Sequence, residues 1–327
     1  MAKPGYRVFE TTVGAIRRLS PHFVRVTFRG EELRDLGWDG PDQRIKVILP
    51  LDGGADEGGG FGGFPTDGDW FGAWRALPDE RRNPIRTYTI RDARPERGEL
   101  DVDFVAHGDS GPASRWIARA EAGERMLLIA PDATSDEPSG GWEWHPGDAS
   151  TLLIAGDETA VPAVSAILEQ LPDDARGAVF LEVPDAADAL ELRAPAGVTV
   201  QWFDRGGDAL PAPGYGSCLV EAVRTWADAW ADEARRDRPV GVGTDGVLGA
   251  PSSLDVAAGP DTELPQLADD EILWEVPEPA RDGGFYAWLA GEATAITTLR
   301  RHLVKGLGVD RRRVAFMGYW KLGRAEG

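Results

Sequence analysis

The chain has 327 residues, and 42% of them are hydrophobic, which is enough to form the cores of two ordinary domains. Its formal net charge of −20 at pH 7 argues against nucleic acids and anionic membranes as partners, because both are polyanions. The single cysteine, Cys218, excludes an internal disulfide, and the four histidines show no metal-ligand spacing, so we expect no protein-bound metal. No apolar run is long enough to span a membrane and "MAKPGYRVFE" has no apolar signal-peptide core, so we expect a cytoplasmic protein.

Short strands dominate the first half of the sequence. "YRVFETTV", "FVRVTFRG", "RIKVILP", "IRTYTIRD", "ELDVDFVAH" and "RMLLIAPD" are rich in β-forming residues and end at glycine, proline or charge. In the fifth of these runs the period of two places Val102 and Phe104 on one side and Asp101 and Asp103 on the other. The segment 53–65 is so rich in glycine that we expect a flexible hairpin loop that does not pack. The pattern predicts an antiparallel barrel of the six-stranded type over residues 1–148.

Residues 149–327 show a different pattern, in which buried strands alternate with helices. "TLLIAGDETAVPAVSAILEQL" predicts a strand, a polar turn and a helix, and "FYAWLAGEATAITTLRRHLV" repeats that order. The runs "AVFLEV", "VTVQWFD" and "RVAFMGYW" predict further buried strands, and Leu219, Val223, Trp226 and Trp230 share one face of a predicted helix. This alternation predicts a parallel sheet with helices on its faces. We interpret 237–282, rich in proline, glycine and acidic residues, as a long and partly disordered insertion.

The letters "GVGTDG" match the glycine pattern of dinucleotide-binding loops at Gly241, Gly243 and Gly246. That motif indicates a nucleotide site only where it joins a strand to a helix. Here neither neighbouring segment suits a strand or a helix, so we interpret the glycines as part of a flexible loop.

The strand "RTYT" carries a group of side chains that suits a flavin. A tyrosine ring, Tyr88, can lie against a flat flavin, and an arginine, Arg86, can form paired hydrogen bonds with a pyrophosphate. The hydroxyl of Thr89 or a backbone amide can reach the ring nitrogen that accepts hydride. The alternative from these three residues alone is a half-exposed strand with a surface arginine and tyrosine.

Three longer segments resemble a known family. "RTYTIRDARPERGELDVDFVAHGDSGPASRWIARAEAGE" resembles the flavin-binding half of the siderophore-interacting proteins, a branch of the ferredoxin-reductase-like flavoproteins. "LLIAGDETAVPAVSAILEQLPDDARGAVFLEV" and "FYAWLAGEATAITTLRRHLVKGLGVDRRRVAFMGYWKLG" resemble the start and the end of the second half of these proteins. The likeness covers most of the chain except residues 206–282, and it implies a flavin-binding barrel followed by an NAD(P)H-binding domain.

The resemblance implies that FAD binds on the barrel. The "RxYT", "DFVxHG" and "GPAS" motifs supply its expected contacts, which are Arg86, Thr87, Tyr88, Thr89, Asp103, Phe104, Val105, His107, Gly108, Gly111, Pro112, Ala113 and Ser114. Backbone amides at the start of a helix also bind pyrophosphate on physical grounds. The alternatives are that His107 is a solvated residue at a strand end and that Ser114 is an ordinary helix residue.

In the second half, the "AGDETA" turn takes the place of the glycine-rich turn of related reductases. Three of its residues, Asp157, Thr159 and Ala160, are expected to contact the flavin, with Thr89 and Thr159 at the flavin edge. The expected nucleotide contacts are Gly156, Glu158, Glu182, Arg205, Gly291 and Glu292. Two alternatives stay open: Asp157 and Glu158 cap the following helix, and Arg205 is a surface arginine.

The implied activity is the reduction of a ferric siderophore, with electrons passing from NADH or NADPH through FAD to chelated Fe(III), followed by release of Fe(II). Two alternatives are the same flavoprotein with reduced ferredoxin as donor and a siderophore-binding protein without enzymatic activity. Many ferric siderophores are anionic, so a local basic patch is expected despite the acidic chain. Three of the four lysines, Lys46, Lys305 and Lys321, are its candidates, and the alternative for each is a solvated surface residue.

Overall fold

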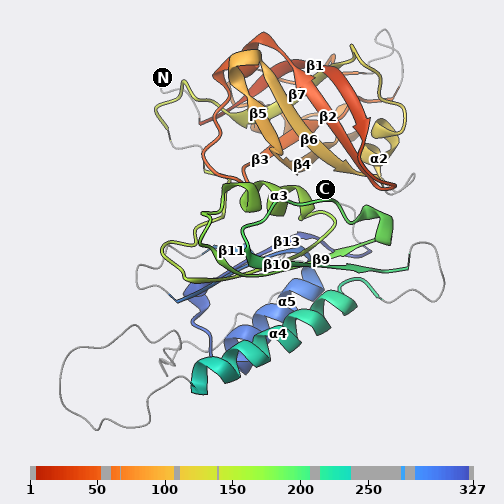
Figure 1. Ribbon diagram of the computed structural model, residues 1–327. Helices are drawn as coiled ribbons and strands as arrows, with labels where there is room; N and C mark the ends of the chain where they lie inside the picture. The colour runs from red at the N-terminus through yellow and green to blue at the C-terminus, as the bar shows by residue number, and fades with distance from the viewer. Residues whose placement is uncertain are drawn as a thin grey trace. The chain divides into compact units, whose positions relative to one another are not determined.

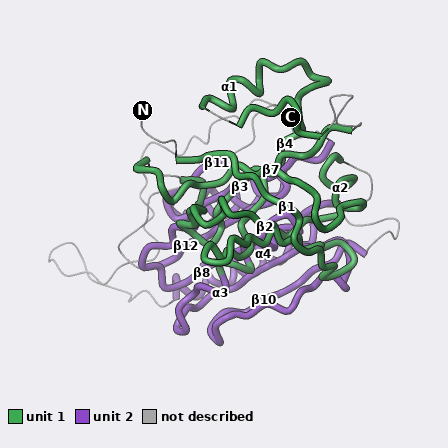
Figure 2. Tube along the Cα trace, turned by 90° about the horizontal axis from the view of Figure 1, so that it is seen from above, with its two compact units in different colours: residues 1–143, 165–167, 325–327 green, residues 144–164, 168–324 purple. Residues whose placement is uncertain are grey.

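The computed structural model describes residues 5–52, 60–66, 68–106, 111–137, 140–206, 214–236, 274–276 and 284–323. The chain separates into two compact units, which Figure 2 shows in different colours. The first consists of residues 1–143 with 165–167 and 325–327, and the second of residues 144–164 and 168–324. The sequence placed this division after residue 148. Each unit is described by itself below.

The first unit is a curled antiparallel sheet (Figure 1). Its strands lie in the order β4-β3-β7-β1-β2-β6-β5. They are β1 (Tyr6–Arg18), β2 (Phe23–Arg29), β3 (Arg44–Ile48), β4 (Ile85–Thr89), β5 (Asp92–Arg94), β6 (Glu99–Val105) and β7 (Arg125–Pro131). The two helices of this unit are α1 (Trp70–Arg75) and α2 (Pro112–Ile117), and short 3₁₀ turns cover Glu31–Asp35, Asp79–Arg81 and Pro95–Arg97.

The two edge strands of this sheet follow one another in the chain, which explains the curl. Between β4 and β5, the amide of Ile90 donates to the carbonyl of Gln43, and the amide of Arg91 donates to the carbonyl of Asp101. These bonds join both ends of the sheet through one bent segment, so β4 and β5 occupy a single position around the barrel. The expected antiparallel barrel of the six-stranded type is therefore confirmed, with β4 and β5 as two parts of one strand.

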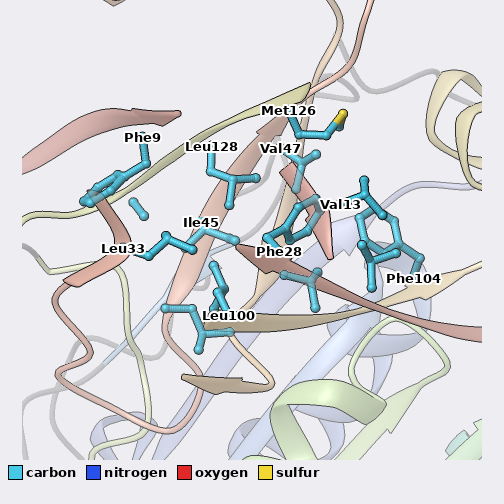
Figure 3. Packing of buried hydrophobic residues seen from close by; sticks show 14 of the residues in the cluster. Phe9, Val13, Phe28, Leu33, Ile45, Val47, Leu100, Phe104, Met126 and Leu128 are labelled. Atoms are coloured by element: carbon cyan, nitrogen blue, oxygen red, sulfur yellow. The ribbon is translucent and has the colours of Figure 1, made fainter. Parts of the chain in front are cut away.

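Alternation along the strands builds the barrel core. Leu100, Val102 and Phe104 of β6 are fully buried in one cluster with Phe9, Phe28 and Leu128, as Figure 3 shows for several of them. The acidic residues between them, Asp101 and Asp103, face the opposite side of the sheet, where they pair with arginines. The period of two read from the sequence is thereby confirmed for β6.

A second, smaller cluster covers the other face of the barrel sheet. It contains Ile48, Leu127 and Ile129 from the strands, and Phe64 and Phe61 pack against it. The expectation that the glycine-rich segment 53–65 does not pack was therefore wrong for its two phenylalanines, because burying an aromatic ring offsets the entropy of ordering a short stretch of backbone. Residues 53–59 lie outside the described residues.

The second unit is a mostly parallel sheet in the order β10-β9-β8-β12-β13-β11. Its elements are β8 (Thr151–Asp157), α3 (Val161–Gln170), β9 (Arg176–Val183), β10 (Gly197–Asp204), α4 (Ser217–Arg236), β11 (Trp274–Glu275), β12 (Phe285–Glu292), α5 (Ala293–Arg301) and β13 (Val314–Trp320), with a π-helical turn at His302–Gly306 and 3₁₀ turns at Ala186–Asp188 and Arg311–Arg313. Helices α4 and α5 lie side by side on one face of the sheet, and α3 lies on the opposite face (Figure 1).

The apolar patterns of this unit place its core. Leu219 and Val223 of α4 are fully buried against Leu153 and Phe180 of the sheet, and Trp226 and Trp230 pack at the edge of the same cluster. The face predicted for this helix is therefore confirmed. Within the predicted insertion 237–282 the structure describes Trp274–Glu275 as strand β11, which pairs antiparallel with β13, so this part is ordered.

Candidate functional site

The "RTYT" strand is β4, and two of its predicted site residues share one face. Arg86 lies opposite Val47 and Tyr88 opposite Ile45, both on β3, on the face that carries the barrel core. The ring of Tyr88 lies 4.3 Å from the ring of Phe104, measured between centroids. Both Arg86 and Tyr88 are half-buried, so each keeps an accessible part beside the core.

The threonines of this strand lie on the opposite face. Thr87 accepts a hydrogen bond of 2.6 Å from Nζ of Lys46, and Thr89 is 6% exposed. The side chain of Thr89 therefore points away from the face of Arg86 and Tyr88, because successive residues of a strand point to opposite faces. A flavin contact by Thr89 stays a prediction. On the face that carries Arg86 and Tyr88, Thr89 can therefore offer only its backbone atoms to a ligand.

Strand β6 separates its predicted site residues in the same way. Phe104 is fully buried under Tyr88, whereas Asp103 faces outward and is held by Arg25 at 2.6 Å and 2.8 Å and lies 3.8 Å from Arg91. Val105 ends the strand half-buried. Two further predicted contacts, His107 and Gly108, lie outside the described residues.

The predicted "GPAS" turn begins helix α2 as expected. Gly111 is the residue before the helix and Pro112 its first residue, while Ala113 packs on the barrel core and Ser114 is 7% exposed. A pocket of about 80 Å³ lies beside this turn. It is lined by Pro50, Leu51, Asp52, Pro84, Pro112, Arg115, Trp116 and Arg119.

The pocket lies next to β4 and adds further positively charged side chains. Pro84 of its wall directly precedes Ile85, the first residue of that strand, and two arginines, Arg115 and Arg119, reach it from α2 and the residues just after it. Arg119 forms an exposed ion pair of 2.9 Å with Asp52. A half-buried aromatic ring, a nearby arginine and a cationic pocket are the donor set that a flat flavin ring with a diphosphate tail requires. The residues of this unit therefore fit FAD.

In the second unit, polar residues gather where the parallel strands end. Asp157 ends β8, Glu182 precedes the last residue of β9, Glu292 ends β12 and Trp320 ends β13. Parallel strands place their carboxyl ends at one edge of the sheet, where ligands bind in open α/β folds. Sequence spacing alone brings Asp157 close to Glu158 only, and the sheet adds the others.

Asp157 holds this edge together through four hydrogen bonds. Its Oδ1 accepts from the amide of Thr159 at 2.9 Å and from its hydroxyl at 2.5 Å. Its Oδ2 accepts from the amide of Glu292 at 2.7 Å and from the indole nitrogen of Trp320 at 2.8 Å. Burial and the neighbouring charge of Glu158 raise the pKa of Asp157 to about 7, although these hydrogen bonds lower it.

Glu158 and Glu182 share one arginine. Arg205 donates to Glu158 at 2.7 Å and 2.9 Å and to Glu182 at 3.3 Å, and all three side chains are buried. Glu182 also accepts from the amides of Gly216 at 2.7 Å and Leu219 at 3.0 Å, at the start of α4. Glu182 and Arg205 thus form hydrogen bonds within the protein. A nucleotide contact by either residue stays a prediction, and it requires these hydrogen bonds to break.

Two alternatives from the sequence are corrected here. Arg205 is 6% exposed, so it is not a surface arginine. Helix α3 starts at Val161 with Ala160 at its cap position and no side-chain cap, so Asp157 and Glu158 do not cap it. Their carboxylates instead accept hydrogen bonds from residues of β12, β13 and the segment after β10. A buried carboxylate needs several such donors.

The glycines of the predicted nucleotide set serve close packing. A Cβ on Gly156 would lie 2.5 Å from Cβ of Ala160 and 2.7 Å from the carbonyl of Ala290. Gly291 has a φ of +143°, and a Cβ there would lie 2.6 Å from Oδ2 of Asp157. Glycine at these two positions allows β8, β12 and the turn after β8 to approach one another.

The three candidate lysines do not form one patch. Lys321 follows β13 at the carboxyl edge of the second sheet, whereas Lys305 lies in the π-helical turn after α5, before β13 begins at the other edge. The seven residues of β13 separate these two edges by about 20 Å at about 3.3 Å per residue. Lys46 belongs to the first unit. Lys305 and Lys321 therefore do not belong to the same local patch, and a substrate contact by each lysine stays a prediction.

Sequence reasoning missed Tyr215 as a member of this edge. Its ring lies 5.0 Å from the ring of Trp320 in an edge-to-face arrangement and 4.3 Å from the guanidinium carbon of Arg205. Tyr215 is 40% exposed, which is unusual for a large ring held on two sides. No local pattern marks it, because its ring partner Trp320 is distant in the sequence and Arg205 lies ten residues before it on another segment.

Comparison with protein families covers both units. The siderophore-interacting FAD-binding domain matches residues 12–135, and the siderophore-interacting protein family matches residues 149–323, more than half of the chain. The chain belongs to the siderophore-interacting protein family. The family match spans the AGDETA turn and the strand ends described above, and the FAD-binding match spans β4, β6 and α2.

Curated relatives support the same assignment. An uncharacterized protein of Mycobacterium tuberculosis is 37% identical over 66% of this chain and 73% of its own length. Ferric vibriobactin reductase ViuB of Vibrio cholerae is 34% identical over 61% of this chain and 68% of its own length. The chain is thus a homologue of a ferric siderophore reductase.

Solved structures show the fold over nearly the whole chain. The siderophore-interacting protein SipS of Aeromonas hydrophila is 30% identical with a TM-score of 0.63, covering 98% of this chain and 94% of that one. The ferredoxin reductase of carbazole 1,9a-dioxygenase, at 13% identity and a TM-score of 0.51, covers 96% of this chain and 70% of that one, and shares the fold alone. The ferredoxin-reductase-like fold expected from the sequence is confirmed.

The described residues contain neither a metal-ligand cluster nor a membrane-spanning helix. No group of three or more histidine, cysteine, aspartate or glutamate side chains there is arranged to hold a metal ion. None of the helices in the described part of the chain is both long and apolar enough to cross a membrane.

Proposed function

We propose that this protein is an FAD-dependent reductase that takes electrons from NADH or NADPH and reduces the Fe(III) of a ferric siderophore. The observation that carries the proposal is the match of both halves to the siderophore-interacting family, together with a named ferric vibriobactin reductase at 34% identity. The geometry of β4 and of the pocket beside α2 supports it independently, because it supplies the side chains that FAD requires.

The contacts with FAD are assigned from this chain's own residues. Tyr88, supported from below by Phe104, lies against the flat ring system, and Arg86 reaches the diphosphate. Arg115, in the pocket beside the first turn of α2, adds a second cation for the same tail. FAD supplies the conversion between two-electron and one-electron transfer that Fe(III) reduction needs.

The protein's part in the reaction is to bind and orient. Hard anionic oxygen ligands hold Fe(III) better than Fe(II), so reduction loosens the metal without an acid or base on the protein. The substrate is a chelate of ferric iron, and we assign Lys46, which donates a hydrogen bond to Thr87 of the flavin strand, to its binding. Lys321 is assigned to the same substrate class from the carboxyl edge of the second unit. The cytoplasm, where reduced nucleotides are available, is the proposed compartment.

A visible absorption spectrum of the purified protein tests the proposal. We expect a yellow protein whose flavin bands bleach when NADH or NADPH is added without oxygen. Addition of a ferric siderophore together with a ferrous chelator should then restore the bands and produce the colour of the ferrous complex. If the flavin bands bleach only with reduced ferredoxin, ferredoxin and not NAD(P)H is the electron donor. If the purified protein is colourless and binds a siderophore, it is a binding protein and not a reductase.

A further inference from the structure

The order in which the chain adds strands to the second sheet reverses between β8 and β12. The chain builds β8, β9 and β10 outward to one side and β12 and β13 to the other, with α3 on one face and α5 on the opposite face (Figure 1). Such a reversal opens a crevice at the carboxyl ends of the two central strands, and ligands of open α/β sheets bind there. The two residues that end these strands are Asp157 and Glu292.

Asp157 joins the two sides of this reversal. One of its oxygens accepts from the Thr159 amide and hydroxyl, and the other accepts from the Glu292 amide and the Trp320 indole at 2.7 Å and 2.8 Å. Gly291 leaves the room for the second oxygen. Four donors on a fully engaged carboxylate therefore fix the end of β13 relative to the ends of β8 and β12.

The fixed indole belongs to a small aromatic surface. Tyr215 meets Trp320 edge to face at 5.0 Å and covers the Arg205 guanidinium, whose carbon lies 4.3 Å from its ring. Arg205 is in turn held by Glu158 and Glu182. The two rings are supported from beneath by buried ion pairs, while Tyr215 is 40% exposed and Trp320 is half-buried. We call Trp320 and Tyr215 the aromatic platform.

The negative charge around the aromatic platform determines which ligand groups can bind there. The buried carboxylates of Asp157, Glu158, Glu182 and Glu292 gather at this edge, and the buried guanidinium of Arg205 pairs with two of them, Glu158 and Glu182. An excess of negative charge at a strand-to-helix turn repels a diphosphate, and it favours a flat ring that is neutral or positive. The nicotinamide ring of a pyridine nucleotide is neutral when reduced and cationic when oxidised, whereas its adenine ring stays neutral.

We propose that Asp157 is a positioning residue that holds Trp320 and Tyr215 as a platform for the nicotinamide ring of the electron donor, and that it favours the oxidised ring. The inference rests on the proposed use of NADH or NADPH. Asp157 acts through the indole hydrogen bond and through its charge, so two substitutions separate these roles. Asp157→Asn removes the charge and, because an amide has one acceptor oxygen, also loses one of the two donor pairs. Trp320→Phe keeps a ring and the charge of Asp157 and removes only the indole donor.

The test measures binding to the FAD-loaded protein by isothermal titration calorimetry. The probes are an oxidised nucleotide and its unreactive tetrahydro analogue, which carries a neutral ring, in the NAD or NADP form that binds more tightly. Nicotinamide mononucleotide and 5′-AMP distinguish the two ends of the donor. Asp174→Asn, an exposed residue of the same unit, is the charge-matched control.

We expect the wild type to bind the cationic ring more tightly than the neutral one, and Asp157→Asn to reduce that preference about fivefold, which corresponds to about 1 kcal/mol. Trp320→Phe should weaken both probes alike. As pH rises from 6 to 8 the preference of the wild type should grow, while Asp157→Asn should show none of this dependence. Besides Asp157, the charged residues on this edge and the adjoining segments are Glu158, Glu182, Glu292, Arg205 and Lys321.

Three results would overturn the inference. If Asp157→Asn behaves like Asp174→Asn, Asp157 has no role in donor binding. If 5′-AMP binds at the platform and nicotinamide mononucleotide does not, the ring assignment is wrong. In both cases nucleotide-driven bleaching of the flavin still supports the proposed function. If neither dinucleotide binds or bleaches the wild type, the proposed donor fails and the inference fails with it.

Discussion

Buried carboxylates on the barrel and Asp157 at the edge of the second sheet have pKa values that are shifted in opposite directions. On the outer face of the barrel, Asp101 and Glu99 both accept from Arg94, at 3.0 Å in each case. Burial raises the pKa of Asp101, but hydrogen bonds from Arg94 and Thr27 outweigh it and lower the pKa, and Arg94 also lowers the pKa of Glu99. Each carboxylate there has an arginine partner.

At the carboxyl edge of the second sheet, carboxylates outnumber cations. Arg205 is shared by Glu158 and Glu182. Burial and then the charge of Glu158 raise the pKa of Asp157 to about 7, and its hydrogen bonds from Thr159 and Trp320 only partly offset them. Burial raises the pKa of the acid in both regions, and on the barrel the hydrogen bonds from arginine reverse that effect. A shifted acid in a strand-end crevice is also typical of functional sites.

The largest expected effect is at the shared arginine. Arg205→Met leaves Glu158 and Glu182 buried without a cation, and removing one partner of a buried pair costs about 3–5 kcal/mol. Urea unfolding followed by circular dichroism measures the loss. The matched change on the barrel is Arg94→Met, whose side chain is 24% exposed and whose acids can reach water, and its cost should be smaller. Equal losses for the two variants would erase the contrast between the regions.

The next effect concerns Asp157 and has a definite sign. A folded pKa of about 7 lies above the unfolded value near 3.8, so the contribution of this group to stability is complete below about pH 4 and is lost as pH rises through 7. A shift of this size corresponds to at most about 4 kcal/mol. The free energy of unfolding, measured between pH 4 and 8, should fall more steeply in the wild type than in Asp157→Asn. Parallel curves would show that Asp157 ionises normally.

A smaller effect is expected for flavin binding to the barrel. Arg86→Met removes a charged hydrogen-bonding partner worth about 1.5–3 kcal/mol, so FAD should bind roughly 10- to 100-fold more weakly. Fluorescence titration of the apoprotein with FAD gives the dissociation constant. Arg81→Met, on an exposed 3₁₀ turn of the same unit, serves as control and should bind FAD like the wild type. An unchanged constant for Arg86→Met would contradict the assignment of Arg86 to the diphosphate.

The smallest effect is the acid response of the barrel ladder. Because the folded pKa values of Glu99 and Asp101 lie below their unfolded values near 4, their contribution is present above about pH 5 and is lost as pH falls below 4. Arg94→Met should flatten the stability curve below pH 5 and leave its shape above pH 5 unchanged. If Arg94→Met instead flattens the curve only between pH 5 and 8, the pH dependence of stability does not come from Glu99 and Asp101, and this prediction is wrong.

Much of the fold was predictable from local pattern. The alternation of Val102 and Phe104 with Asp101 and Asp103 specifies which face of β6 enters the core, since side chains alternate along any strand. The apolar run before Asp157 marks a strand buried on both faces. The same rule of alternation should have separated Thr89 from Arg86 and Tyr88, and the error there came from reading proximity in sequence as proximity in space.

The amino-acid sequence by itself determined the two kinds of sheet, their order, the family, and the residue types that suit a flavin, because periodicity and motifs are local properties of the chain. Only the tertiary structure decided that Arg205 is buried between two glutamates, that Lys305 and Lys321 lie at opposite edges, and that Asp157, Trp320 and Tyr215 meet. Those contacts join residues far apart in the chain. They follow from the strand order of a folded sheet, which no local pattern contains.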